Sequence, residues 1–220
     1  SSDVCSSDLS FTLLFLRSTH SRDITMKSVL VIGAGTMGNG IAHLHAQHGY
    51  NVTLVDVNDA ALMRGIATIE SNLGRQVKKG TMSEEESLAT RGRIHTSTDL
   101  RVASAGADLI IEAASENFEI KKSLFATIDE CAPAHAILAS NTSSISITEI
   151  AAVTKRPEKV IGMHFFNPVP IMKLCELVRG QATSDETFAL VRSVAESTGK
   201  TPVEVQDYPG DRKSTRLNSS

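Results

Sequence analysis

The chain has 220 residues, of which 41% are hydrophobic and 21% are charged, and its formal net charge is −3. This length accommodates one complete α/β domain, and the composition is that of a globular protein. The slight acidic excess argues against nucleic-acid binding, which usually comes with a basic surplus. Because no apolar run reaches the roughly 20 residues that cross a bilayer, we predict a soluble protein without a membrane partner.

The two ends of the chain differ in composition from its middle. Residues 1–25 are rich in serine and show no sustained helical or strand period. A mitochondrial transit peptide is the weaker interpretation, since Arg17 and Arg22 favour it but three aspartates oppose it. Both ends resemble translated sequencing-adapter sequence. We therefore predict a non-native leader over 1–25, a domain over 26–210 and a non-native tail over 211–220.

The first predicted strand, residues 28–32, runs into a glycine-rich segment and then a helical pattern that ends near Gly49. In a nucleotide-binding turn of this kind, Gly33 permits the tight bend, Gly35 lets the backbone approach a pyrophosphate, and Gly38 lets helix and strand pack closely. Amides at the helix N-terminus then attract the phosphates. We include Thr36 and Met37 among the predicted cofactor-binding residues.

A second strand, residues 51–55, ends in Asp56, which lies 18 residues beyond Gly38. This is close to the roughly 20 residues expected for the carboxylate that binds the adenosine ribose. Such an acid accepts hydrogen bonds from the ribose hydroxyls and repels a 2′-phosphate, so the predicted cofactor is NAD rather than NADP. The alternative is a glycine-rich turn followed by an incidental aspartate.

Metal binding is not predicted. His43, His45 and His48 follow the glycines on the first helix but lack the i, i+4 spacing of a zinc-binding pair, so we expect them at the surface or its boundary. The three cysteines have no ligand spacing and are interpreted as reduced thiols.

The remaining predicted elements alternate between helix and strand. Two helices, over 60–79 and 83–92, form a hairpin in which Ser83 and Glu86 make a capping box. Cations near the hairpin tip are either solvated or attract a phosphate-bearing substrate such as coenzyme A; they are Arg75, Lys78 and Lys79. Strands are predicted over 94–96, 109–112, 136–139 and 160–164, and helices over 100–105, 118–131 and 147–152.

This alternation predicts an α/β fold with a Rossmann-type, doubly wound, mainly parallel sheet and an inserted helical hairpin. Ligands of such sheets bind beyond the carboxyl ends of the strands. We therefore expect the segments 112–117, 140–144 and 164–167 to surround one crevice.

A histidine and a glutamate at the end of this sheet suggest proton-transfer chemistry. Oxidising a secondary alcohol requires hydride departure and removal of the hydroxyl proton, and histidine is the natural proton acceptor near neutral pH. A carboxylate on its far nitrogen fixes the tautomer and stabilises the imidazolium. His164 ends a predicted strand and Glu176 lies on the next, with a turn containing Pro168 and Pro170 between them. An exposed strand carboxylate is the alternative for Glu176.

Several segments together resemble the L-3-hydroxyacyl-CoA dehydrogenase family, most nearly its bacterial 3-hydroxybutyryl-CoA members. They are V-I-G-A-G-T-M-G, I-E-A-A-S-E-N, S-N-T-S-S, G-M-H-F-F-N-P-V-P and K-L-C-E-L-V. The resemblance implies that His164 is the general base, Glu176 its partner, and Ser143 a hydrogen-bond donor to the substrate oxygen. It also implies that Glu116 and Lys121 contact the cofactor and that Asn141 lies near the nicotinamide. Ser143 has a second interpretation, as the cap of a helix that starts near Ile145.

The resemblance implies NAD-dependent interconversion of 3-hydroxyacyl-CoA and 3-oxoacyl-CoA, in fatty-acid or butanoate metabolism. It further implies a bacterial cytoplasmic enzyme, with the mitochondrial matrix less favoured, and a homodimer formed through a C-terminal all-helical domain. Here the residues after Gly210 depart from the family pattern, so we expect that domain to be missing from this sequence and the crevice to be open on one side. The alternative function is therefore an NAD-binding fragment or structural relative without turnover.

Overall fold

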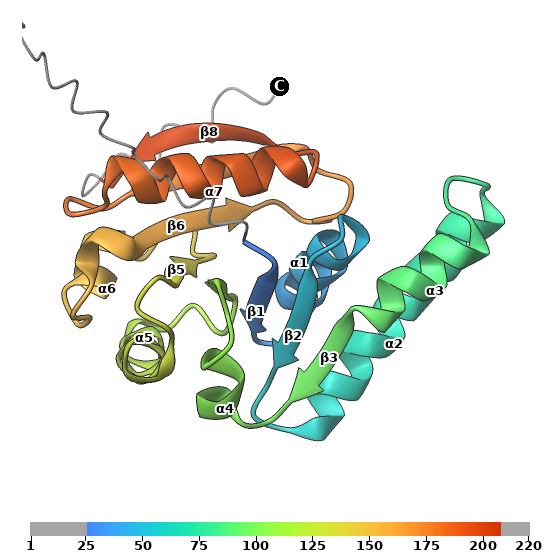
Figure 1. Cartoon of the computed structure of the whole chain (residues 1–220), viewed down its shortest axis with the longest axis horizontal. Coiled ribbons are helices and arrows are strands. Elements are labelled where there is room, and N and C mark those ends of the chain that lie inside the picture. The colour runs from blue at the N-terminus through green and yellow to red at the C-terminus, as the bar shows by residue number, and fades with distance from the viewer. Residues whose placement is uncertain (1–25, 208–220) are drawn as a thin grey trace, which may run out of the picture.

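The computed structural model describes residues 26–207, so the predicted leader, tail and exact domain limits lie outside the described residues. Eight strands form one sheet in the order β3-β2-β1-β4-β5-β6-β7-β8, with helices on both faces (Figure 1). The strands are β1 (Ser28–Ile32), β2 (Asn51–Val55), β3 (Ile94–Ser97), β4 (Leu109–Glu112), β5 (Ile137–Ser140), β6 (Val160–Phe165), β7 (Leu174–Arg179) and β8 (Thr201–Gln206). The helices are α1 (Thr36–Gln47), α2 (Asp59–Lys78), α3 (Glu84–Gly92), α4 (Leu100–Ser104), α5 (Phe118–Cys131), α6 (Ile147–Ala151) and α7 (Asp185–Ser197), with a 3₁₀ turn, η1 (Pro157–Lys159).

Six of the seven strand pairs are parallel, and only β6 and β7 pair antiparallel. The prediction of a doubly wound, mainly parallel sheet is thus confirmed. The chain winds outward from β1 to β3 on one side, and then from β4 to β6 on the other. Strand order therefore reverses between β1 and β4, which is where ligands of such sheets enter.

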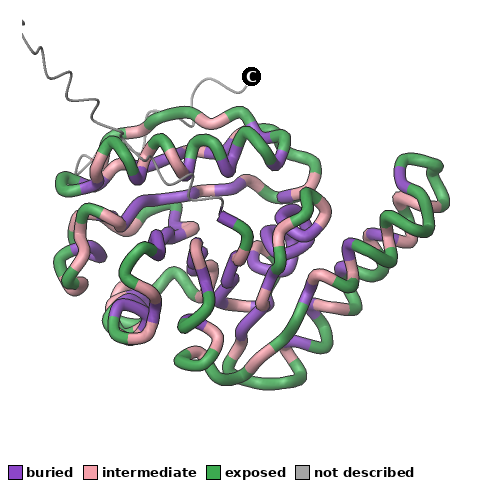
Figure 2. The backbone as a smooth tube through the Cα atoms, in the orientation of Figure 1, coloured by how far each residue is buried: buried purple, intermediate pink, exposed green. Residues whose placement is uncertain are grey.

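Burial on both faces explains why the central strands are continuously apolar. Leu30 and Val31 of β1 and Leu109 to Ile111 of β4 have no exposed area. One apolar cluster packs on each face of the sheet, because a parallel sheet is covered by helices on both sides. Figure 2 shows this buried interior along the strands and more exposed backbone at the far end of α2 and α3.

The α2–α3 hairpin projects from the body of the molecule (Figure 1). Its predicted capping box is confirmed, since the Ser83 hydroxyl accepts from the Glu86 amide at 3.1 Å and the Glu86 carboxylate accepts from the Ser83 amide at 2.7 Å. The cations that were predicted near the tip are exposed; they are Arg75, Lys78 and Lys79. Their exposure suits both interpretations offered for them.

The expectation for two histidines is wrong. His43 and His45 have no exposed area, whereas His48 is exposed. The reason is that α1 lies at the centre of the molecule, with the sheet on one side and α2, α3 and the β6–β7 loop around it. Burial lowers the pKa of both imidazoles to about 4.

Two C-terminal elements, α7 and β8, lie outside the elements predicted from the sequence. A cap signal was available for α7, since the Ser184 hydroxyl accepts from the Thr187 amide at 3.1 Å. The strand β8 lies at the sheet edge, contains Pro202 and has no buried residue, so its composition resembles a loop. Over residues 26–207, none of the helices is long and apolar enough to cross a membrane.

Candidate functional site

The glycine-rich turn has the geometry expected of a nucleotide loop. Gly33 has φ +98°, a conformation that favours glycine, and a Cβ at Gly38 would lie 1.7 Å from the Gly33 carbonyl oxygen. Both glycines are therefore required by the backbone itself. Gly35 differs, because a Cβ there would meet nothing within 4 Å. Open space over Gly35 fits a ligand that approaches this backbone closely.

The first turn of α1 is also suited to an anion. The helix starts at Thr36, and its N-cap, Gly35, supplies no side-chain hydrogen bond. Orphan amides at a helix N-terminus attract negatively charged groups such as phosphates. Met37, on the same turn, lines the cleft described below.

Asp56 lies where β2 ends, beside the glycine-rich turn. One carboxylate oxygen, Oδ2, accepts a hydrogen bond from the Ala34 amide at 2.8 Å. This bond ties the end of β2 to the loop after β1. Within residues 26–207 nothing else binds this carboxylate, so Oδ1 is free for a ribose hydroxyl.

A cleft of about 2060 Å³ opens beyond the carboxyl ends of the strands. Its lining includes residues of all three segments that were expected to meet there, namely Ala113, Ala114 and Glu116, Asn141–Ser144, and His164–Asn167. The expectation of a common crevice is thus confirmed, although Glu112 lies buried beneath it.

His164 and Glu176 face each other at the antiparallel junction. They are register partners on β6 and β7, and His164 Nδ1 lies 2.9 Å from Glu176 Oε2. Their side chains are 18% and 15% exposed, so the interpretation of Glu176 as an exposed strand carboxylate is wrong. Because the carboxylate engages Nδ1, the second ring nitrogen, Nε2, is left for a ligand in the cleft. The Phe166 ring stands 4.7 Å from the imidazole, centroid to centroid.

Glu116 orders the loop that carries Ser143. Its Oε1 accepts from the Thr142 hydroxyl at 2.5 Å and from the Ser143 amide at 3.0 Å, and also from the amide and hydroxyl of Ser144. Burial alone would raise the pKa of Glu116, but the Thr142 hydrogen bond and the nearby Lys121 charge bring it below its usual value. Glu116 is therefore an ionised anchor for this loop.

Ser143 is exposed and lines the cleft. The alternative that it caps a helix is wrong, because α6 begins at Ile147 and is capped by Ser146, whose hydroxyl accepts from the Glu149 amide at 3.3 Å. The Ser143 side chain is thus left available for a ligand.

A buried charge network beneath the cleft was not predicted. Lys121 and Glu112 have no exposed side-chain area, and the Lys121 ammonium lies 2.8 and 2.7 Å from the two oxygens of Glu112. It also lies 3.6 Å from Glu116 Oε2. Glu112 accepts further bonds from the Ser140 hydroxyl at 2.7 Å and the Ala114 amide at 2.8 Å. One sequence feature could have indicated this network, namely the charged Glu112 at the end of the otherwise apolar strand β4.

The predicted contact between Lys121 and the cofactor therefore stays a prediction, and the structure places this ammonium below Glu116. Asn141 has a clearer position at the cleft wall. Its side-chain Oδ1 accepts from the Phe165 backbone amide at 2.9 Å, and its backbone amide donates to the Glu112 carbonyl at 2.7 Å. Asn141 thus joins the ends of three neighbouring strands, β4, β5 and β6.

Comparisons with known proteins identify the family of the chain. Residues 28–208 match the family described as 3-hydroxyacyl-CoA dehydrogenase, NAD binding domain. The chain is 50% identical to a probable 3-hydroxybutyryl-CoA dehydrogenase of Bacillus subtilis, over 84% of this chain and 64% of that protein. It is 41% identical to the human mitochondrial hydroxyacyl-coenzyme A dehydrogenase, over 88% of this chain and 63% of that protein.

A solved structure, the (S)-3-hydroxybutyryl-CoA dehydrogenase of Ralstonia eutropha, superimposes with a TM-score of 0.82 at 47% identity. The match covers 84% of this chain and 65% of the other. The chain thus spans less than two thirds of the length of these relatives.

Proposed function

Because the chain belongs to the NAD-binding-domain family of 3-hydroxyacyl-CoA dehydrogenases, we propose that its cleft oxidises (S)-3-hydroxyacyl-CoA to 3-oxoacyl-CoA and catalyses the reverse reduction. The observation that carries the proposal is the His164–Glu176 pair, 2.9 Å apart and facing the cleft. Names of the relatives favour a short acyl chain such as 3-hydroxybutyryl.

The proton is handled by this chain's own residues. With Nδ1 held by Glu176, the Nε2 lone pair of His164 accepts the proton from the substrate's 3-hydroxyl. The carboxylate then stabilises the imidazolium that forms, as it does in hydrolytic triads. Ser143 donates a hydrogen bond to the substrate oxygen, and Glu116 keeps its loop in place.

The cofactor is proposed to lie along the carboxyl ends of β1, β2 and β4. Gly33, Gly35 and Gly38 with Thr36 and Met37 hold the pyrophosphate, and Asp56 holds the adenosine ribose. Glu116, Lys121 and Asn141 form the nicotinamide end, with Lys121 acting through Glu116. When bound there, NAD supplies the acceptor for the hydride that leaves C3 of the substrate.

The first experiment is titration of the chain with NAD and NADP, followed by an assay of acetoacetyl-CoA reduction with NADH. We expect NAD to bind more tightly than NADP. In Asp56→Ala we expect the difference between the two affinities to become smaller. We expect His164→Gln to lower kcat by about 10²–10⁴-fold, the range of general acid–base catalysis.

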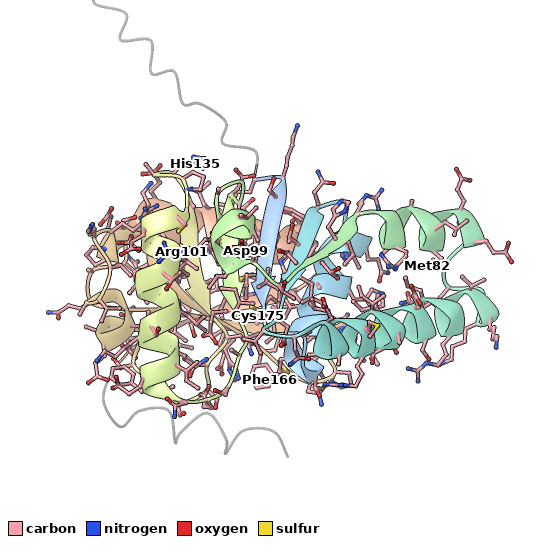
Figure 3. The ribbon with its side chains drawn as sticks, turned by 90° about the horizontal axis from the view of Figure 1, so that it is seen from below. Met82, Asp99, Arg101, His135, Phe166 and Cys175 are labelled. Atoms are coloured by element: carbon pink, nitrogen blue, oxygen red, sulfur yellow. The ribbon has the colours of Figure 1, made fainter. Side chains whose placement is uncertain are left out.

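His135→Gln is the matched control. His135 also pairs with a carboxylate, Asp108, at 3.0 Å, but it lies at the opposite end of the molecule from Phe166 of the cleft (Figure 3). NAD binding without turnover in the unmodified chain would support the alternative of a cofactor-binding unit. Turnover that survives in His164→Gln would refute the role of this histidine.

Other features of the whole protein are also proposals. Homodimerisation can be tested by analytical ultracentrifugation of the chain. We propose a cytoplasmic location by analogy with the bacterial relatives, whereas the human relative is named as mitochondrial. A role in fatty-acid or butanoate metabolism is proposed from the reaction itself.

A further inference from the structure

Lys200 is a buried lysine directly before β8, the strand that pairs with β7, and it is not among the residues that line the cleft. It follows the turn after α7, where Gly199 has φ +72°, and it is 7% exposed. Its ammonium donates to the carbonyl oxygens of Val169 and Met172 at 2.5 and 2.7 Å. Both acceptors belong to the loop between β6 and β7. No step of the proposed reaction uses Lys200, so its burial requires another explanation.

That loop, residues 166–173, joins the strand that ends near His164 to the strand that begins before Glu176. Its inner turn is closed by the amides of Ile171 and Met172, which both donate to the Pro168 carbonyl at 3.0 Å. The carbonyls of Val169 and Met172 are left without a strand partner. The Lys200 ammonium donates a hydrogen bond to each of these two carbonyls and so links them. An apolar side chain at this position could not supply these hydrogen bonds.

The same loop is also held from the other side. Val169 is 2% exposed and packs against α1 so closely that a Cβ at Gly40 would lie 3.0 Å from its Cβ. The lysine backbone is itself fixed, because its amide donates to the Ala195 carbonyl at 3.1 Å. The loop is thus clamped between the nucleotide-binding helix and the end of α7.

We propose that Lys200 is a positioning residue, whose ammonium fixes the β6–β7 loop so that His164 and Glu176 stay paired. The proposal rests on the function proposed for that pair and extends it to a residue outside the cleft. Burying an ammonium is costly unless its donors are satisfied. Here the two loop carbonyls satisfy it, so the cost is offset only when the loop has the conformation that keeps β6 and β7 in register.

The test is a long-range ¹H–¹⁵N spectrum of the histidine rings, recorded without cofactor or substrate at a pH where imidazole is neutral. His164 is assigned by the signal that is lost in His164→Gln. In the unmodified chain we expect a single tautomer, with the proton on Nδ1, because that nitrogen donates to Glu176. In Lys200→Met we expect a mixture of tautomers, with faster hydrogen exchange at the Ile171 and Met172 amides.

Two controls separate positioning from loss of stability. Lys173→Met removes an exposed lysine from the same loop. Arg156→Met removes a half-buried arginine that bonds to α5 on the other side of the sheet. Both should keep the single His164 tautomer. If Lys200→Met does not fold, Lys200→Gln takes its place, and its shorter amide should give a smaller change in the same direction.

An unchanged His164 spectrum in the Lys200 variant would overturn the proposal. So would an equal change in Arg156→Met, because the effect would then follow general destabilisation. Since the spectrum needs neither NAD nor turnover, failure of the proposed function leaves this result readable.

Discussion

The buried pair of Lys121 and Glu112 allows a stability effect to be worked out from the structure. Both side chains have no exposed area, and the ammonium lies within 2.8 Å of each carboxylate oxygen. Replacing Lys121 with methionine keeps an unbranched, flexible side chain but removes the charge. The Glu112 carboxylate then stays buried without its cation.

Breaking a buried ion pair on one side costs about 3–5 kcal/mol. We expect the lower end of this range, because Glu112 keeps hydrogen bonds from the Ser140 hydroxyl and the Ala114 amide. At roughly 2–4 °C per kcal/mol for a chain of this size, the melting temperature should fall by about 10 °C. Urea unfolding followed by far-ultraviolet circular dichroism measures the free energy directly.

The double variant Lys121→Met with Glu112→Gln tests the reasoning behind this number. The neutral amide removes the uncompensated charge, so the double variant should be more stable than Lys121→Met alone. Lys122→Met is the control on the same helix, because its partner Glu119 lies 3.6 Å away with a side chain that is 77% exposed, and such surface pairs contribute about 1 kcal/mol or less. A loss below about 1 kcal/mol in Lys121→Met, or a double variant no more stable than the single one, would refute the argument.

Three further predictions concern acid stability, the nucleotide loop and a helix terminus. Burial lowers the pKa of His43 and His45 to about 4 from 6.5, so each contributes stability that is complete above pH 6.5 and is lost as the pH falls toward 4. The free energy of unfolding should fall by roughly 3 kcal/mol per histidine across this pH window. In His45→Gln, the free energy of unfolding measured with urea should therefore depend less steeply on pH. An unchanged pH dependence would contradict the low pKa of His45. Gly35→Ala should leave the melting temperature nearly unchanged but weaken NAD binding at least tenfold by calorimetry, since its Cβ meets only open space; equal affinity would place the pyrophosphate elsewhere. Arg156→Met should lower stability by about 2–3 kcal/mol, because its guanidinium bonds to the Asp129 carboxylate at 2.7 Å and to carbonyls at the end of α5; a change under 0.5 kcal/mol would show these bonds to be without net value.

The sequence alone predicted the elements that position the site. β1, β2, β4 and α5 have the predicted bounds, because apolar runs, caps and glycine turns are local signals. The glycine spacing and Asp56 indicated the nucleotide loop, and the His164–Glu176 pair followed from one histidine, one glutamate and the turn between them. The strand β8 escaped prediction because an exposed edge strand with a proline carries no such signal.

Only the tertiary structure decided how deeply the polar side chains lie and which groups they meet. The sequence did not indicate that the Lys121 ammonium of α5 pairs with Glu112, at the end of β4, and with Glu116, in the loop that follows it. His43 and His45 were expected at the surface, and Lys200 had no predicted role. Burial and pairing depend on segments far apart in the chain, so they become defined only when the sheet, its helices and the β6–β7 loop pack together.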